Sequence, residues 1–466
     1  MAEAGARPPE ASFAPPRGDS AQREGGAPEA GARPPEASFA PPRGDGAQRE
    51  GGAPEAGARP PEASFAPPRG DSAQNFRVLV LNQIAASGLA RLPRDRYEVG
   101  TEVAQPDAIM VRSADLHQAV IPASVKAIAR AGAGTNNIPV KAMNLRGVPV
   151  FNAPGANANA VKELVLAGML MAARNLPAAM QFVQSLEPAA ADLDGLVEEG
   201  KKAFGGRELA GRTIGVIGLG RVGCLVADAA IRLGMQAVGF DPEITVEAAW
   251  SLPSQVQRAA SVSDLVRRCD FISVHVPLLD ATRHLIDQRQ LANMRPGTVL
   301  LNFSRDAVVD VGAVLAALEA GRLASYVCDF PASSLLRHGK VIAMPHLGAS
   351  TREAEENCAV MVAEQLRDFL EHGNIRHSVN FPEAVAPRES AYRVAIANAN
   401  VPNMLGQIST TMAEAGLNIH TMLNKSRGEM AYTLVDVDSP VPPQVVTAVA
   451  AIEGVLSVRY LPASPA

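Results

Sequence analysis

An arginine and a histidine, each placed just after a short apolar run, are the residues of this chain best suited to catalysis. Arg305 comes four residues after the run 299–301, and His346 comes two residues after the run 341–344. A guanidinium can bind a carboxylate through two parallel hydrogen bonds. An imidazole can exchange a proton near neutral pH. Either residue alone is more often a surface ion pair or a structural histidine, but together they suit a reaction that holds a carboxylate and moves a proton.

The segment 213–241 carries the pattern of a dinucleotide-binding unit. An apolar strand runs into a G-x-G-x-x-G motif, a helix with apolar residues at helical spacing follows, and a second strand ends at Asp241. The glycines, which are Gly218, Gly220 and Gly223, allow a tight turn and a close approach of the backbone to a pyrophosphate at the positive end of the helix. Asp241, about 20 residues further on, can accept from both ribose hydroxyls and would repel a 2′-phosphate, which favours NAD over NADP.

Short apolar strands alternate with helices on both sides of this motif, which indicates a parallel α/β fold with two lobes and a cleft between them. Strands are expected before the motif at 78–81, 108–112, 127–129 and 148–152, with a helix at about 159–175. Further strands are expected to end near residues 276, 303, 330 and 344. Ligands bind at the carboxyl ends of parallel strands, so the polar residues at these ends are the candidates for a site.

Residues 1–74 form an extension of a different kind. The segment 3–28 recurs at 29–54 with one change and begins again at residue 55, and none of these residues is Ile, Leu or Val. Such a composition buries too little apolar surface to offset the entropy of the chain. We therefore expect a disordered tandem-repeat extension.

Composition excludes several classes of partner. The formal net charge is −5 without an obvious basic patch, so no nucleic acid is expected. No stretch approaches 18 uninterrupted apolar residues, so no membrane span is expected. The four cysteines (Cys224, Cys269, Cys328 and Cys358) share no metal-binding spacing, which predicts no metal site and buried thiols in a reducing cytoplasm.

Three separated motifs, at 218–223, 302–305 and 345–351, resemble those of the D-2-hydroxyacid dehydrogenase family in order and spacing. The resemblance covers about residues 76–466. It implies an α/β protein with two Rossmann-like lobes, which are a split substrate-binding domain (75–174 and 352–376) and an NAD-binding domain (175–351). The split explains why the glycine motif lies so late in the chain.

The resemblance also implies roles for individual residues. Arg305 would bind the carboxylate and C2 oxygen of the substrate, and His346 would be the acid/base. The substrate phosphate and carboxylate would be held by Arg112, Ser113, Asn157 and Lys201, although Lys201 is equally compatible with a solvated helix end. The cofactor would be contacted by Gly218, Gly220, Arg221, Val222, Gly223, Asp241, His275, Pro277, Thr282, Ser304, Asp329 and Gly348.

One departure from the family pattern concerns the catalytic histidine. The family normally supplies a glutamate soon after the strand that ends here at Asp329, and that glutamate orients the imidazole. Residues 330–336 of this chain read FPASSLL and contain no acid. Ser333 or Ser334 takes that role, another carboxylate reaches in, or His346 works unassisted.

Residues 391–466 look like a separate module that follows a short linker, 377–390. A β-α-β-β-α-β order predicts a ferredoxin-like α+β fold, and the segment resembles the ACT regulatory domain, which binds serine across a dimer interface. Asn398, Asn400 and Asn418 match the positions that line that effector site, whereas Asn403 replaces a glycine usual there. Regulation by L-serine and a module used only for assembly remain equal alternatives.

Within the family, the chain most resembles members that oxidise 3-phosphoglycerate to 3-phosphohydroxypyruvate, the first step of serine biosynthesis. The resemblance implies NAD as cofactor and a cytoplasmic homodimer or homotetramer. The alternatives are another small 2-hydroxyacid, such as glyoxylate or hydroxypyruvate, and a non-catalytic NAD-sensing protein. Arg112 together with Lys201 favours a substrate that carries a phosphate.

Overall fold

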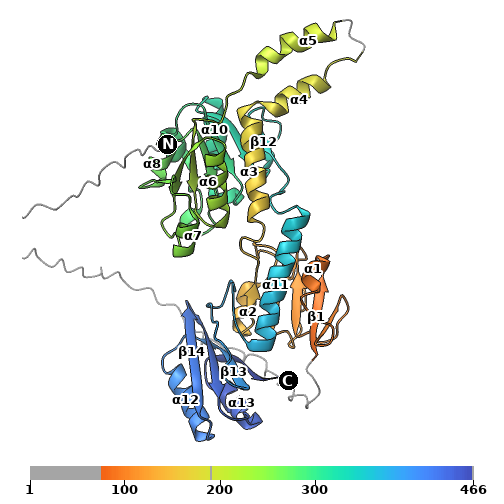
Figure 1. Ribbon diagram of the computed structural model, residues 1–466, viewed down its shortest axis with the longest axis vertical. Helices are drawn as coiled ribbons and strands as arrows, with labels where there is room; N and C mark the ends of the chain where they lie inside the picture. The colour runs from red at the N-terminus through yellow and green to blue at the C-terminus, as the bar shows by residue number, and fades with distance from the viewer. Residues whose placement is uncertain (1–74, 189–191, 464–466) are drawn as a thin grey trace, which may run out of the picture. The chain divides into compact units, whose positions relative to one another are not determined.

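The structure is a computed structural model that describes residues 75–188 and 192–463 (Figure 1). The repeat extension predicted for residues 1–74 lies outside the described residues. The described chain contains two parallel sheets and one antiparallel sheet. The parallel α/β pattern predicted from the sequence is therefore confirmed.

The first parallel sheet has the strand order β2-β1-β3-β4-β5. Its strands are β1 (Phe76–Leu81), β2 (Tyr97–Gly100), β3 (Ala108–Val111), β4 (Ala127–Arg130) and β5 (Val150–Phe151). The edge strand β2 was not predicted, because Tyr97 is its one buried residue and its apolar signal is weak. The short helices beside this sheet are α1 (Ala86–Leu89) and α2 (Val140–Leu145).

A helix from much later in the chain completes this first sheet. α11 (Arg352–His372) contacts α1, β4 and β5, and its Val362, Leu366 and Phe369 share a buried core with Val78 and Met110. Figure 1 shows α11 beside the β1 and α1 segments, which precede it by more than two hundred residues of sequence. The core of the first sheet is therefore completed by residues that follow the second sheet in sequence.

The second parallel sheet has the order β12-β11-β10-β9-β6-β7-β8. Its strands are β6 (Thr213–Ile217), β7 (Gln236–Phe240), β8 (Gln257–Arg258), β9 (Phe271–Val274), β10 (Thr298–Asn302), β11 (Leu323–Cys328) and β12 (Val341–Ala343). Strand order reverses between β6 and β9, which is the switch point where doubly wound sheets bind ligands. The glycine motif follows β6, so the topology places it at this point.

Helices cover both faces of the second sheet. One face carries α3 (Ala158–Ala173) and α6 (Arg221–Arg232). The other carries α8 (Val262–Arg268), α9 (Gln288–Asn293) and α10 (Val311–Glu319). Although α3 belongs by sequence to the part that precedes the glycine motif, its Val165 and Met169 pack in the core of the seven-stranded sheet.

The C-terminal sheet is antiparallel with the order β14-β15-β13-β16. Its elements are β13 (Tyr392–Ala399), α12 (Met404–Glu414), β14 (Ile419–Arg427), β15 (Met430–Val437), α13 (Pro443–Ala450) and β16 (Val455–Pro462). This is the ferredoxin-like topology predicted from the sequence. Residues from α12 and α13 share a core with one face of the sheet. The other face contributes Tyr432 and Leu434 to the core of the first sheet and α11.

A helical hairpin, not predicted as separate helices, follows α3. It consists of α4 (Leu176–Gln184), α5 (Leu193–Gly200) and a 3-10 turn, η1 (Lys201–Phe204), and Figure 1 shows it extending beyond α3. The rings of Phe182 and Phe204, 5.4 Å apart, join its two arms. Several of its apolar side chains are exposed, namely Leu176, Met180, Val183, Leu193 and Leu196.

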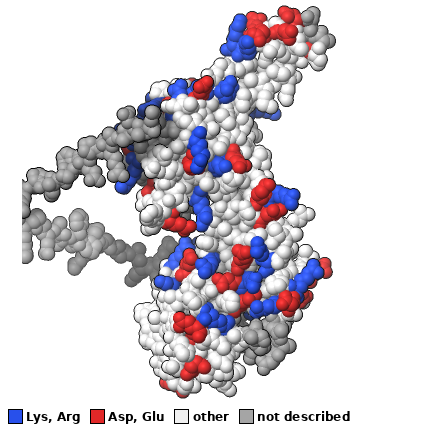
Figure 2. Space-filling view, in the orientation of Figure 1, with Lys and Arg blue, Asp and Glu red and all other residues white. Residues whose placement is uncertain are grey.

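Three further observations concern the surface charge, the cysteines and the apolar character of the helices. On the face drawn in Figure 2, acidic and basic side chains are interspersed without a large patch of one sign. All four cysteines are buried and free, as predicted. Among the described residues, no helix combines the length and apolar character needed to cross a membrane.

Candidate active site

The glycine motif forms the turn between β6 and α6. Gly218 has a φ of +91°, and a side chain there would lie 2.8 Å from the backbone carbonyl of His275. A Cβ on Gly223 would collide with the carbonyl oxygen of Gly218. At Gly220, by contrast, a Cβ would meet no atom within 4 Å. Gly218 and Gly223 are thus needed for the packing of the turn, because a side chain at either would collide with the backbone. The space beside Gly220 is open and could hold a ligand.

The start of α6 is an anion site whose donors are unused. Cys224 makes the first intrahelical bond of this turn, from its N–H to the Gly220 carbonyl at 3.0 Å. Within the described chain, the N–H groups of Arg221, Val222 and Gly223 have no acceptor. Because such groups carry the positive end of the helix dipole, they fit a pyrophosphate.

Asp241 is held rigidly beyond the end of β7. Its Oδ2 accepts from the Leu219 N–H at 2.8 Å, and its Oδ1 accepts from the Glu243 N–H at 2.9 Å. Both bonds fix the carboxylate next to the glycine turn. The turn, the open helix end and this carboxylate together fit the pyrophosphate and ribose of NAD.

The loop after β9, the strand next to β6, is organised by its own side chains. Thr282 Oγ1 donates to the Pro277 carbonyl at 2.6 Å and accepts from the Leu279 N–H at 2.8 Å. His275 Nε2 lies 2.8 Å from Ser273 Oγ. Burial lowers the pKa of His275 to about 4, so this imidazole is neutral at physiological pH. The three predicted cofactor residues of this loop therefore lie at the switch point.

The turn that presents Arg305 is shaped by Asn302, a buried residue that the sequence did not single out. Asn302 Oδ1 accepts from the N–H of Ser304 at 3.1 Å and from its hydroxyl at 3.0 Å. Asn302 Nδ2 donates to the Arg305 carbonyl at 2.8 Å. The guanidinium of Arg305 forms no ion pair in the part of the chain that the structure describes, so it is available to an anion.

A second arginine, Arg130 at the end of β4, lies near Arg305. A Cβ built on Gly134 would lie 3.2 Å from Arg305 Nη2 and 3.8 Å from Arg130 Nη1. Arg130 Nε also donates to the Arg112 carbonyl at 3.1 Å. Burial, together with the charges of Arg305 and Arg112, lowers the pKa of Arg130. Sequence reasoning missed Arg130, whose signal was its place directly after a buried strand.

His346 occupies a strained loop after β12. Its φ is +57°, a left-handed conformation that non-glycine residues rarely adopt. Its N–H donates to the Asp329 carbonyl at 3.1 Å, and Asp329 accepts from the N–H groups of Leu347 at 2.7 Å and Gly348 at 2.8 Å. Burial raises the pKa of Asp329, and these amide bonds oppose that rise. Asp329 thus clamps three successive residues of the histidine loop.

The imidazole itself is exposed and packs against an aromatic ring. The rings of His346 and Phe330 are 4.9 Å apart. No described side chain forms a hydrogen bond with the imidazole, and neither Ser333 nor Ser334 is bonded to it. Asp329 is the carboxylate coupled to it electrostatically.

Backbone bonds connect the two catalytic candidates. The Asp329 N–H donates to the Asn302 carbonyl at 3.2 Å, and the Asp329 carbonyl accepts from His346. The ends of β10, β11 and β12, which are neighbours in the sheet, are therefore joined at one edge. Arg305 and His346 extend from this edge.

The remaining substrate candidates lie in different surroundings. Arg112 pairs with Glu355 of α11 at 2.6 Å, and the Ser113 N–H donates to Asn82. Asn157 precedes α3, and its side chain makes no capping bond. Lys201 is 61% exposed in η1 and pairs with Glu198, and no contact joins it to the arginines described above. Its role in binding phosphate stays a prediction.

The chain was compared with known families, proteins and structures. Residues 166–348 match the NAD binding domain of the D-isomer specific 2-hydroxyacid dehydrogenases. The chain is 33% identical over 341 residues to D-3-phosphoglycerate dehydrogenase of Haemophilus influenzae, an alignment that covers 70% of this chain and 79% of that protein. The corresponding protein of Escherichia coli K12 matches with the same identity and coverage.

Two solved structures illustrate the range of similar folds. Cofactor (NAD+) bound 3-phosphoglycerate dehydrogenase of Entamoeba histolytica matches with a TM-score of 0.51 and 25% identity, over 66% of this chain and 99% of that one. A glyoxylate reductase from Paecilomyes thermophila matches with a TM-score of 0.53 and 25% identity, over 66% of this chain and 98% of that one.

Proposed function

The chain belongs to the D-2-hydroxyacid dehydrogenase family, and we propose that it catalyses the NAD-dependent oxidation of 3-phosphoglycerate to 3-phosphohydroxypyruvate. The observation that carries this proposal is the sheet edge from which Arg305 and His346 both extend, with Arg130 near Arg305 and bonded to the Arg112 carbonyl. Several cations suit a substrate with two anionic groups, a carboxylate and a phosphate. The names of the relatives support the same substrate.

The chain's own residues divide the work of the reaction. Arg305 binds the carboxylate and orients C2, while Arg112 and Arg130 provide positive charge for the phosphate. A ring nitrogen of His346 takes the proton of the C2 hydroxyl as that carbon becomes a ketone. Asp329 holds the histidine loop in position. NAD, when bound at the start of α6, supplies the hydride acceptor.

The predicted domain organisation is part of the proposal. Residues 75–174 and 352–376 would form the substrate-binding domain, 175–351 the NAD-binding domain, and 391–466 an ACT-like regulatory domain after the linker 377–390. The returning helix α11 and the ferredoxin-like topology support the limits of the second and last segments. Because α3 packs on the seven-stranded sheet, it favours a start of the NAD-binding domain before residue 175.

An effector site for L-serine would need two copies of the chain. Ile419 and Tyr392 both face Val437 of β15, so Asn418 lies at the end of the sheet where β13 begins. Asn398 and Asn400 lie at the other end, where β13 finishes. The three asparagines cannot meet within one module. Millimolar L-serine should lower activity or raise Tm if the site exists, and the absence of both effects would leave assembly as its role.

Assembly into a homodimer or homotetramer is supported by the helical hairpin. Met180 and Val183 of α4 are 62% and 59% exposed, and such apolar side chains on a projecting element favour contact with a second chain. Light scattering would determine the oligomeric state. The cytoplasmic location expected from the cysteines belongs to the same proposal.

Two alternatives remain testable. The match to a glyoxylate reductase favours a small 2-hydroxyacid without phosphate, and the missing glutamate favours a protein that binds NAD without catalysis. Oxidation of NADH, followed at 340 nm with 3-phosphohydroxypyruvate beside hydroxypyruvate and glyoxylate, tests both, because turnover of the unphosphorylated substrates alone would favour the first alternative. We expect turnover in the wild type and loss of turnover, with NADH binding retained, in Arg305→Ala and His346→Ala. NADH binding without turnover in the wild type would instead favour the sensor.

A further inference from the structure

The expected phosphate ligand Arg112 is already paired with a carboxylate. Glu355, in the first turn of α11, places its Oε1 2.6 Å from Nη2 of Arg112. The side chains are 34% and 40% exposed, so an anion from solution can reach the pair. An arginine engaged in this way offers fewer donors to a phosphate than a free one.

Glu355 is the one carboxylate paired with this group of arginines. In the described ranges 75–188 and 192–463, no other acid forms an ion pair with Arg112, Arg130 or Arg305. Burial raises the pKa of the Cys358 thiol, one turn further along α11. The charges of Arg130 and Arg112 lower this pKa, and the charge of Glu355 raises it. The carboxylate therefore belongs to the same electrostatic environment as the proposed substrate site.

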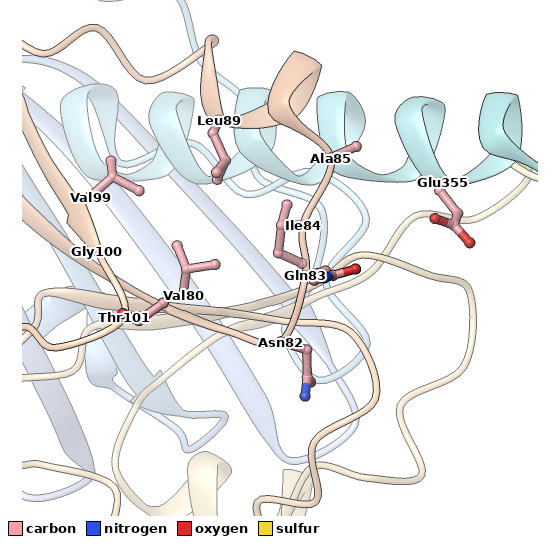
Figure 3. A pocket seen from close by; sticks show the side chains of 10 residues that line it. All are labelled: Val80, Asn82, Gln83, Ile84, Ala85, Leu89, Val99, Gly100, Thr101 and Glu355. Carbon is pink, nitrogen blue, oxygen red and sulfur yellow. The ribbon is translucent and has the colours of Figure 1, made fainter.

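A pocket beside Glu355 offers space for its carboxylate in a second position. The pocket has a volume of about 430 Å³ and lies between the ends of β1 and β2 and the start of α11 (Figure 3). Apolar side chains such as Val80, Leu89 and Val99 line one part of it. In Figure 3 the Gln83 side chain points toward Glu355, whereas the Asn82 side chain points away from it.

The two amides of this pocket have donors to spare. Asn82 uses its Oδ1 to accept from the N–H groups of Ser113 and Ala114, at 3.2 and 2.6 Å, which leaves its Nδ2 group without an acceptor among the described residues. The Gln83 amide likewise has no partner in the described part of the chain. A carboxylate that left Arg112 toward the pocket would find a neutral donor in the Gln83 amide.

We propose that Glu355 is a specificity-determining residue that occupies the anion position at Arg112 until the phosphate of the substrate displaces it toward the pocket. This inference rests on the proposed function, because it assumes that Arg112 receives the phosphate. A phosphate carries more charge and more acceptor oxygens than a carboxylate and can replace it on a guanidinium. A substrate that ends in a neutral hydroxyl cannot, so it binds with the Glu355–Arg112 pair intact, and Glu355 sets the affinity for phosphorylated substrates alone.

Glu355→Gln tests this role because it removes the charge and keeps the shape. We expect the KM for 3-phosphohydroxypyruvate to fall by about threefold to fivefold, the scale of an exposed charge pair, with kcat unchanged. The KM for hydroxypyruvate, which lacks the phosphate, should stay the same. An unchanged or higher KM for the phosphorylated substrate would overturn the proposal.

The matched control is Glu356→Gln, one residue along the same helix. Glu356 pairs with Arg352 at 2.9 Å and has no contact with Arg112. The same fall in KM in this variant would show a general effect of helix charge and would overturn a specific role for Glu355. If Glu355→Gln folds poorly, as judged by its Tm, Glu355→Ala replaces it with the same expectation.

Binding of inorganic phosphate separates this inference from the proposed function. Tighter binding of phosphate to the Glu355→Gln holoenzyme than to the wild type, measured by calorimetry, would support the competition even if neither substrate were turned over. Equal affinities would overturn it. Absence of turnover in the wild type would count against the proposed function alone.

Discussion

The geometry at His346 combines backbone strain with an unusual lack of side-chain partners. A left-handed conformation at a non-glycine residue costs about 1–3 kcal/mol and persists only where surrounding bonds enforce it. Here the bonds come from Asp329, which accepts from Leu347 and Gly348 and whose carbonyl accepts from His346 itself. In a site without the usual glutamate, the position of the imidazole depends on its loop more than on a second carboxylate.

Asp329→Asn should therefore impair catalysis. An amide has one acceptor atom and would direct an NH₂ group at one of the two N–H donors, so the loop would shift and kcat would fall by about 100-fold. Steady-state kinetics would measure the change. Asp310→Asn is the matched control, because Asp310 also accepts from a backbone N–H, at 3.1 Å from Ala313, but caps α10. Equal kcat values in both variants would contradict this account.

His275 should make stability depend on pH. Its pKa in the folded protein is lowered to about 4 by burial, below the ordinary value of 6.5. Between these values the unfolded chain binds a proton that the folded chain does not, so stability falls as the pH falls through this window. The loss should be about 2 kcal/mol, less than the full shift implies because the imidazole is only half-buried.

Denaturant unfolding of the wild type and of His275→Gln between pH 7 and pH 4 would measure the contribution of His275. The variant should lose less stability than the wild type over this range. Parallel curves for the two proteins would show that another group causes the dependence.

At the scale of elements, the turn between β6 and α6 separates structural from ligand-binding glycines. Gly223 cannot accept a side chain because the Gly218 carbonyl lies in its way, whereas Gly220 has no neighbour within 4 Å. The open space at Gly220 is then space for the pyrophosphate.

Alanine at Gly223 should affect the stability of the fold, and alanine at Gly220 should affect the binding of NAD. Gly223→Ala should destabilise the fold by about 3 kcal/mol, which a lowered Tm would show. Gly220→Ala should keep the Tm and weaken NAD binding by at least about tenfold, since the methyl group would occupy the place of the phosphates. Calorimetric titration with NAD provides the second measurement, and normal affinity in Gly220→Ala would place the cofactor elsewhere.

The sequence predicted the buried, apolar strands well and the exposed elements poorly. β7, at 236–240, ends next to Asp241 as expected, because its apolar run stops there. β2 and the hairpin of α4 and α5 were missed. β2 has one buried residue, and α4 and α5 have none, so the apolar runs that mark buried elements are absent there. At the site, motifs identified Arg305 and His346, but the contacts of Arg130 and Glu355 arise from elements distant in sequence and required the structure.

At the scale of the whole molecule, a buried ion pair in the C-terminal sheet helps to join that sheet to the preceding part of the described chain. Arg393 is fully buried and binds Asp436 through two bonds of 2.6 and 2.8 Å. It also donates to the carbonyls of His372, Ala386 and Pro387. The C-terminal sheet is thereby fastened to the end of α11, the helix whose first turn carries Glu355.

Breaking this pair should destabilise the protein more than replacing it. Arg393→Met leaves the buried Asp436 with the Glu389 N–H as its remaining donor among the described residues and should cost about 3–5 kcal/mol of unfolding free energy. Adding Asp436→Leu should recover part of that loss, but not the bonds to the three carbonyls. Thermal unfolding of the two variants would measure the difference. A double variant no more stable than Arg393→Met would show that the carbonyl bonds dominate.

The central claim is that Arg112 and Arg130, together with Arg305, select a phosphate-bearing 2-hydroxyacid. Its most direct test is the ratio of kcat/KM for 3-phosphohydroxypyruvate to that for hydroxypyruvate, in the wild type and in Arg112→Gln. We expect a ratio of at least about 100 in the wild type that falls by about tenfold or more in the variant, as for loss of a charged hydrogen-bonding partner. A wild-type ratio near one, or a ratio that Arg112→Gln leaves unchanged, would contradict the account.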